Sequence, residues 1–296
     1  MNPVVAKSYQ FCQQVARRSA KNFYYAFLLL PHEQRLSMYA LYAFLRHTDD
    51  LADSRESLVA REYALVDWRR QLADALNGRF ENQCLLAVVD TLERCKIPPA
   101  LLESVIDGVE MDLALEAGQR RYETFAELAE YCDHVAGDVG IACLHIWGCH
   151  DQQAAEPARR AGLALQLTNI LRDLQEDYAH RRRYLPREDY ERFDLDADAP
   201  LAPPIDERWR NLIRFEVARA ERFYDDATQV VRWLDPATAS VFRTLTGTYR
   251  ALLEEIRRRD GDVFGPRVRV GTWRKLRIVA GSLAWRARAA AGVQPA

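Results

Sequence analysis

The chain has 296 residues, with 41 Lys and Arg against 43 Asp and Glu, so its formal net charge is −2. This balance lacks the basic excess that neutralises phosphates, and we expect no nucleic-acid partner. Hydrophobic residues make up 49% of the chain and charged residues 28%, which argues against a wholly disordered protein.

The start of the chain, MNPVVAKSYQF, lacks the long apolar segment of a signal peptide. No apolar stretch further along approaches the roughly 20 residues that a membrane-spanning helix needs. The six cysteines form no CxxC pair and match no zinc-site spacing. We therefore expect a cytoplasmic protein whose cysteines are reduced, small core residues.

Apolar residues spaced by three and four predict long helices in chain order, over 38–53, 163–178, 209–234 and 241–259. No alternating strand pattern persists, and the 13 glycines are few for a chain of this length, which favours helix. The Pro-containing segment 194–206, with Pro203 and Pro204, is interpreted as a loop. We predict an all-α fold that forms one domain over 1–296.

Two of these helices carry acidic residues on one face of an otherwise apolar surface. Positions four, three and four apart share a face; the first such face comprises Tyr42, Arg46, Asp49 and Asp53. Positions three, four and four apart form the second, which comprises Gln166, Asn169, Asp173 and Asp177. Asp50 and Glu176 lie off these faces and are expected to support them.

Carboxylates one turn apart repel each other, and burying them is costly unless a cation lies between them. Oxygen donors suit Mg²⁺, which combines a few carboxylates with water and phosphate oxygens. Arginines beside both faces could clamp those phosphates. A pair of solvated acidic faces is the simpler alternative, and a di-iron bundle would need a Glu-x-x-His pairing that this chain lacks.

At these residues the sequence resembles the squalene/phytoene synthase family. Several segments follow the family order from about residue 19 to 280, which makes them specific as a set. The matching segments are 21–31, 39–53, 131–140 (YCDHVAGDVG), 166–177 with 183–186, 249–256 and 273–276. The small residues of 135–140 suit either a cavity wall or close packing of helices.

The resemblance implies an all-α, isoprenoid-synthase-type helical bundle with a central cavity, and it assigns roles. Mg²⁺ ligands would be Asp49, Asp53, Asn169, Asp173 and Asp177. The four aspartates and Tyr131 would be catalytic. Substrate-binding residues would be Ser19, Ala20, Lys21, Asn22, Phe23, Tyr42, Arg46, Gln166, Arg172, Arg183 and Tyr249. Some members have a hydroxyl residue where this chain has Ala20.

The implied reaction is a Mg²⁺-dependent, head-to-head condensation of two prenyl diphosphates. We expect two farnesyl diphosphates to give presqualene diphosphate or squalene, as in bacterial hopanoid-type enzymes. Phytoene, the carotenoid-type product of two geranylgeranyl diphosphates, is the alternative. NADPH is expected only if squalene is the end product.

Two other kinds of protein remain open at this stage. One is a helical protein that binds prenyl lipids without turnover. The other is a head-to-tail prenyltransferase or terpene cyclase, because residues 49–53 also fit the DDxxD pattern. Downstream isoprenoid enzymes are expected partners, and the basic segment 274–288 would bring the chain to the inner face of a membrane if it binds lipid.

Overall fold

The computed structural model describes residues 2–201 and 205–291, with Lys21 and Asn22 by backbone alone. The helices are α1 (Pro3–Ser19), α2 (Lys21–Phe27), α3 (His32–Ala52), α4 (Leu58–Leu76), α5 (Leu85–Cys95), α6 (Ala100–Glu116), α7 (Phe125–Cys132), α8 (Asp138–Ile146), α9 (Ala155–Ala179), α10 (Arg187–Arg192), α11 (Glu207–Ala227), α12 (Pro236–Arg258) and α13 (Thr272–Ala290). The described residues contain no strand, so the all-α prediction is confirmed.

Short turns of other helix types connect some of these elements. A five-residue π-helical turn, η1 (Asp133–Gly137), joins α7 directly to α8. Two 3₁₀ turns, η2 (Gln152–Ala154) and η3 (Thr228–Trp233), precede α9 and follow α11. The predicted helix over 209–234 is therefore wrong beyond Ala227, where the Thr228 hydroxyl donates to the Asp225 carbonyl and the chain tightens.

The other long helices contain the predicted spans, with longer N-terminal ends. The 163–178 prediction lies in α9, while 38–53 and 241–259 lie in α3 and α12 apart from their last residues. Asp235 explains where α12 begins, because its carboxylate accepts hydrogen bonds from the Ala237 and Thr238 amides.

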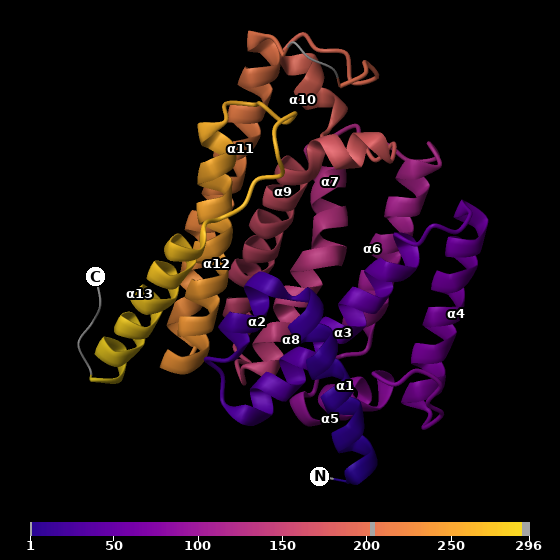
Figure 1. Ribbon diagram of the computed structural model, residues 1–296, viewed down its shortest axis with the longest axis vertical. Helices are drawn as coiled ribbons and strands as arrows, with labels where there is room; N and C mark the ends of the chain where they lie inside the picture. The colour runs from indigo at the N-terminus through magenta and orange to yellow at the C-terminus, as the bar shows by residue number, and fades with distance from the viewer. Residues whose placement is uncertain (1, 202–204, 292–296) are drawn as a thin grey trace.

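The bundle buries two clusters of apolar side chains. One is centred on α1, α3 and α5, and the other on α9, α11 and α12. In Figure 1, α3, α6 and α9 run through the interior, while α4 and α13 lie at opposite edges. Residues 202–204 and 292–296 lie outside the described part, so the single domain over 1–296 stays a prediction.

Two glycines allow α8, η1 and α9 to approach closely. A Cβ on Gly162 of α9 would lie 2.4 Å from the Ala136 carbonyl oxygen of η1. A Cβ on Gly140 of α8 would lie 2.8 Å from the Ala158 carbonyl oxygen. The small residues of 135–140 therefore serve close helix packing, although several of them also line a cavity.

All six cysteines are free, and four of them are buried. None of the helices in the described ranges is both long and apolar enough to cross a membrane.

Candidate active site

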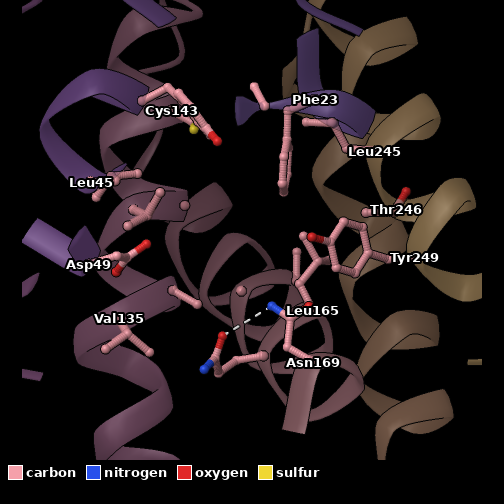
Figure 2. Close-up of a pocket in the computed structure, with 18 of the residues that line it drawn as sticks. Phe23, Leu45, Asp49, Val135, Cys143, Leu165, Asn169, Leu245, Thr246 and Tyr249 are labelled. Atoms are coloured by element: carbon pink, nitrogen blue, oxygen red, sulfur yellow. Dashed lines mark hydrogen bonds between the residues drawn. The ribbon is translucent and has the colours of Figure 1, made fainter. Parts of the chain in front are cut away.

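A cavity of about 950 Å³ lies between α2, α3, α6, α8, α9 and α12. In Figure 2, Leu45 and Asp49 face Leu245, Thr246 and Tyr249 across it. Most of its walls are apolar or aromatic, whereas Asp49, Asp53, Asp112 and Asp173 gather with arginines in its polar part. Its volume lies at the upper end of the roughly 300–1,000 Å³ typical of small-molecule sites.

The first predicted acidic face borders this cavity. Asp49 lies in the last turn of α3, and Asp53 ends that helix with its amide bonded to the Asp49 carbonyl. Burial, and then repulsion from Asp53, raises the pKa of Asp49 to about 7. Two carboxylates that repel each other in this way favour a nearby cation.

The second predicted face lies on α9, and its two carboxylates have opposite surroundings. Asp173 accepts hydrogen bonds from Arg267 (2.8 Å) and from Arg172, which lower its pKa although burial opposes them. Asp177 is one turn further on and does not line the cavity. Burial, and then Asp173, raises the pKa of Asp177 to about 8.

Sequence reasoning missed an acidic pair on α6. The Asp112 carboxylate accepts a hydrogen bond from the Tyr184 hydroxyl at 2.7 Å, and burial raises its pKa to about 6. Glu116, one turn later, is paired with Arg61, which lowers the pKa of Glu116. The four-residue spacing of these acids on an apolar helix is the same signal that identified α3 and α9, so it could have found them.

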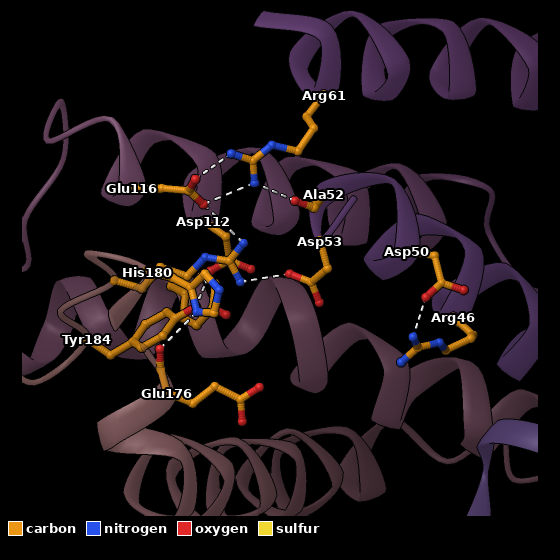
Figure 3. A network of polar contacts seen from close by, with 12 residues as sticks. Arg46, Asp50, Ala52, Asp53, Arg61, Asp112, Glu116, Glu176, His180 and Tyr184 are labelled. Atoms are coloured by element: carbon orange, nitrogen blue, oxygen red, sulfur yellow. Dashed lines mark hydrogen bonds and ion pairs between the residues drawn. The ribbon is translucent and has the colours of Figure 1, made fainter. Parts of the chain in front are cut away.

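Arg182 connects the α3 and α6 acids. Its guanidinium lies 3.0 Å from Asp53 and 3.4 Å from Glu116. Figure 3 shows Asp53, Asp112 and Glu116 together, with Arg46 and Asp50 apart from them. Arg46 is indeed paired with Asp50, on its own helix.

Arg183 does not line the cavity, in contrast to its predicted place at a diphosphate. Its guanidinium donates to the carbonyls of Ala197 and Ala199 and lies over the Tyr178 ring. The reason is local: Arg181 has a left-handed backbone with φ 60°, so the chain turns and Arg182 takes the position beside the carboxylates.

The predicted Tyr131 is buried beside Asp112. Its ring stacks on Tyr184 with centroids 5.3 Å apart, and its hydroxyl accepts a hydrogen bond from Gln166 at 3.3 Å. Burial, and then Asp112, raises the pKa of Tyr131 well above its ordinary value. Asn169 in turn donates to Gln166, which joins the polar residues of α9 to this tyrosine.

Aromatic rings from α2, α3 and α12 lie together in the cavity wall. Phe23 lies 5.5 Å from Tyr249 and 6.4 Å from both Tyr42 and Phe27, between ring centroids. Ser19 and Ala20 also line the cavity. The side chains of Lys21 and Asn22 lie outside the described part, so their predicted contact with substrate stays a prediction.

The donor set fits a hard divalent cation. Asp49 is accessible from the cavity and Asp177 is half-buried, and both have raised pKa values. The Asn169 Oδ1 atom is buried without a hydrogen-bond partner. Over 2–201 and 205–291, however, no group of three or more His, Cys, Asp or Glu side chains is already arranged around a metal position. Phosphate oxygens would have to complete the coordination, as is usual for Mg²⁺.

Comparisons with known proteins agree with this geometry. The squalene/phytoene synthase family model matches residues 16–274. A 15-cis-phytoene synthase of Synechococcus elongatus is 35% identical over 285 residues, covering 92% of this chain and 91% of the relative. A phytoene synthase of Mycobacterium tuberculosis is 33% identical over 284 residues, covering 95% of this chain and 92% of the relative.

Solved structures show the same fold. A dehydrosqualene synthase superposes with a TM-score of 0.85 at 27% identity, over 95% of this chain and 97% of its own. A squalene synthase of Alicyclobacillus acidocaldarius superposes with a TM-score of 0.78 at 29% identity, over 86% of this chain and 95% of its own.

Proposed function

This chain belongs to the squalene/phytoene synthase family, and from that premise we propose that it condenses two geranylgeranyl diphosphates into phytoene. It is a prenyltransferase, and the class of its reaction is the head-to-head condensation of two prenyl diphosphates. The proposal concerns the substrate length, the product and the residues that act.

The main support for this proposal is that one cavity has apolar and aromatic walls and also contains acidic groups and arginines. The apolar walls suit isoprenoid chains, and the polar part suits diphosphates. A lipid carrier would need the apolar walls alone. The carboxylates of α3 and α9 therefore favour turnover over the lipid-binding alternative.

Relatives support the C20 substrate. The phytoene synthases of Synechococcus elongatus and Mycobacterium tuberculosis are 35% and 33% identical to this chain. The solved dehydrosqualene and squalene synthases are 27% and 29% identical. These identities favour phytoene over our expectation from sequence, which was presqualene diphosphate or squalene from two C15 substrates.

In this proposal the α3 and α9 acids, with the Asn169 amide oxygen, hold Mg²⁺. When bound, the metal supplies Lewis-acid stabilisation of the departing diphosphate. Arg46 and Arg172 line the cavity and bind diphosphate oxygens directly. Arg182, like Arg183, is not part of the cavity lining, but it is paired with Asp53 and Glu116 and so lies nearer the site than Arg183 does. Arginine suits this task because its planar fork matches phosphate oxygens.

The cavity walls act on the allylic cation that remains. Phe23, Tyr42 and Tyr249 lie together, and each ring facing a cation contributes about 0.5–2 kcal/mol. The double bond of the second substrate attacks the cation, a proton is lost, and a cyclopropyl diphosphate forms. Its ionisation, rearrangement and loss of a second proton yield phytoene, so the reaction needs no NADPH.

The test is incubation of the purified protein with Mg²⁺ and either C20 or C15 diphosphate, with and without NADPH, followed by mass spectrometry of the extracts. We expect a C40 hydrocarbon from the C20 substrate, independent of NADPH. Asp53→Asn should abolish it while the matched control Asp67→Asn, an exposed acid on α4, retains it. Higher kcat/KM with the C15 substrate would refute the phytoene proposal, and no product from either would refute the catalytic one.

A further inference from the structure

The outward face of α13 carries an apolar stripe that no part of the described chain covers. The spacing of its members is three, four, three and four, so they share one face. This α13 stripe comprises Trp273, Leu276, Ala280, Leu283 and Ala287, all of them exposed. The exposed fractions of Trp273, Leu276 and Leu283 are 85%, 53% and 41%.

The opposite face of α13 already packs against the bundle. Ser282 is buried, Ile278 lies against Gly247 of α12, and the Trp285 ring stacks beneath Arg243 of α12 at 5.0 Å. In Figure 1, α13 runs along α12 at the edge of the molecule. The stripe is therefore not the core-facing side of the helix, and its apolar character needs another explanation.

Basic residues surround this stripe, and acidic residues are missing from its part of the sequence. Residues 263–291 contain seven Arg and Lys and no Asp or Glu, in a chain whose net charge is −2. Arg277 and Arg288 are exposed and flank the stripe on the same side of the helix. A helix with an apolar face, a tryptophan and flanking basic residues is typical of one that lies in the interface of an anionic membrane.

The stripe also adjoins the cavity. Thr272 and Lys275, on either side of Trp273, line the cavity together with residues 267–270. Further along, Arg286 donates to the Leu29 carbonyl after α2, and α2 exposes Tyr25 (67%) with Leu28 beside it (44%). The first turn of α13 thus has one side at the cavity and another in solvent.

We propose that the α13 stripe, with its flanking arginines, docks the protein on the surface of an anionic lipid bilayer. The proposal rests on the proposed function in one respect, because it explains why a cavity for prenyl lipids would open beside such a surface. The long isoprenoid substrates and the hydrocarbon product partition into bilayers. Docking would let them move between bilayer and cavity without crossing water.

The test is flotation of the full-length protein, without substrate, on vesicles of phosphatidylcholine alone or with about one third phosphatidylglycerol. We expect binding to the anionic vesicles only, weakened by added salt. The double variant Trp273→Gln/Leu276→Gln should lower the partition coefficient at least about tenfold, since two large side chains no longer leave water. The variant Arg277→Gln/Arg288→Gln should lower it about fivefold for each charge removed.

A matched control lies at the other edge of the bundle. Val59 and Tyr63 on α4 are exposed at 57% and 72%, so Val59→Gln/Tyr63→Gln removes similar apolar surface and should leave flotation unchanged. All variants should retain turnover in detergent, because none of these residues lines the cavity. Loss of turnover with intact flotation would count against the function alone.

Three outcomes would overturn docking on a bilayer. The first is equal flotation of the parent and the Trp273→Gln/Leu276→Gln variant. The second is equal binding to neutral and anionic vesicles. The third is a dimer in solution that depends on Trp273 and binds no vesicle, which would assign the stripe to a second copy of the chain.

Discussion

Replacing Gly162 with alanine tests the close packing of α9 against η1. The added Cβ would lie 2.4 Å from the Ala136 carbonyl oxygen, 2.5 Å from its carbon and 2.7 Å from the Gly137 nitrogen. Ordinary contacts begin near 3.5 Å, so the backbones must separate by about 1 Å. Overpacking of this kind costs about 3 kcal/mol at the upper end of its usual range, because backbone atoms cannot rotate away.

Helix propensity acts in the opposite direction, since alanine is favoured over glycine by about 1 kcal/mol within a helix. The expected net loss is about 2 kcal/mol, which corresponds to a fall in Tm of about 3 °C for a chain of 296 residues. Thermal unfolding followed by circular dichroism measures it. Gly281 on α13 is the matched control, because nothing lies within 4 Å of its Cβ position.

Gly281→Ala should raise the Tm slightly through propensity alone. If Gly162→Ala also raised the Tm, the close approach of α9 and η1 would be refuted. The two variants share the same chemical change, so their difference isolates the contact with Ala136.

Two further predictions concern buried carboxylates. Asp112→Asn should leave the Tm nearly unchanged, because an amide oxygen still accepts a hydrogen bond from Tyr184. It should lower kcat/KM at least about tenfold, because it removes a negative charge from the cavity. Unchanged kinetics would exclude a catalytic role for that charge. Burial raises the pKa of the Glu216 carboxyl to about 8, although Arg219 opposes this rise; the ordinary value is 4.5. Between pH 4.5 and 8 the folded protein therefore keeps the carboxyl proton that the unfolded chain has released. Stability should therefore fall as pH rises between these values, and Glu216→Gln should flatten that fall in Tm; a parallel pH dependence in both proteins would contradict this assignment.

Helix periodicity is a local property, so the sequence predicts which helices carry the paired acids, although Asp177 does not line the cavity. Asp49 and Asp53 on α3, and Asp173 and Asp177 on α9, follow from spacing alone. Placing Asp112 beside Tyr131 requires knowing that α6 packs next to α7 and η1, which is a tertiary relation. The spacing of Asp112 and Glu116 was visible, but nothing local connected it to the other acids.

The C-terminal half shows a second feature that could not be predicted from the sequence. The apolar period of 209–234 continues through Thr228, although the backbone changes there from α-helix to a 3₁₀ turn. The apolar periodicity indicates which side chains face inward, but it does not distinguish an α-helix from a 3₁₀ turn that continues it. The roles of Arg182 and Arg183 could not be separated either, because they depend on the backbone dihedral of Arg181.

That left-handed residue has a consequence for comparing relatives. Arg181, Arg182 and Arg183 are chemically identical, yet the first is exposed, the second meets Asp53 and Glu116, and the third fastens the loop at 197–199. The contacts of each arginine depend on the left-handed φ of Arg181 and on its number of residues from the end of α9. Deleting one residue between His180 and Arg183 would keep the charge nearly intact while presenting a different arginine to the acids. When relatives are aligned over this segment, the number of residues after α9 should therefore decide which arginines correspond to each other.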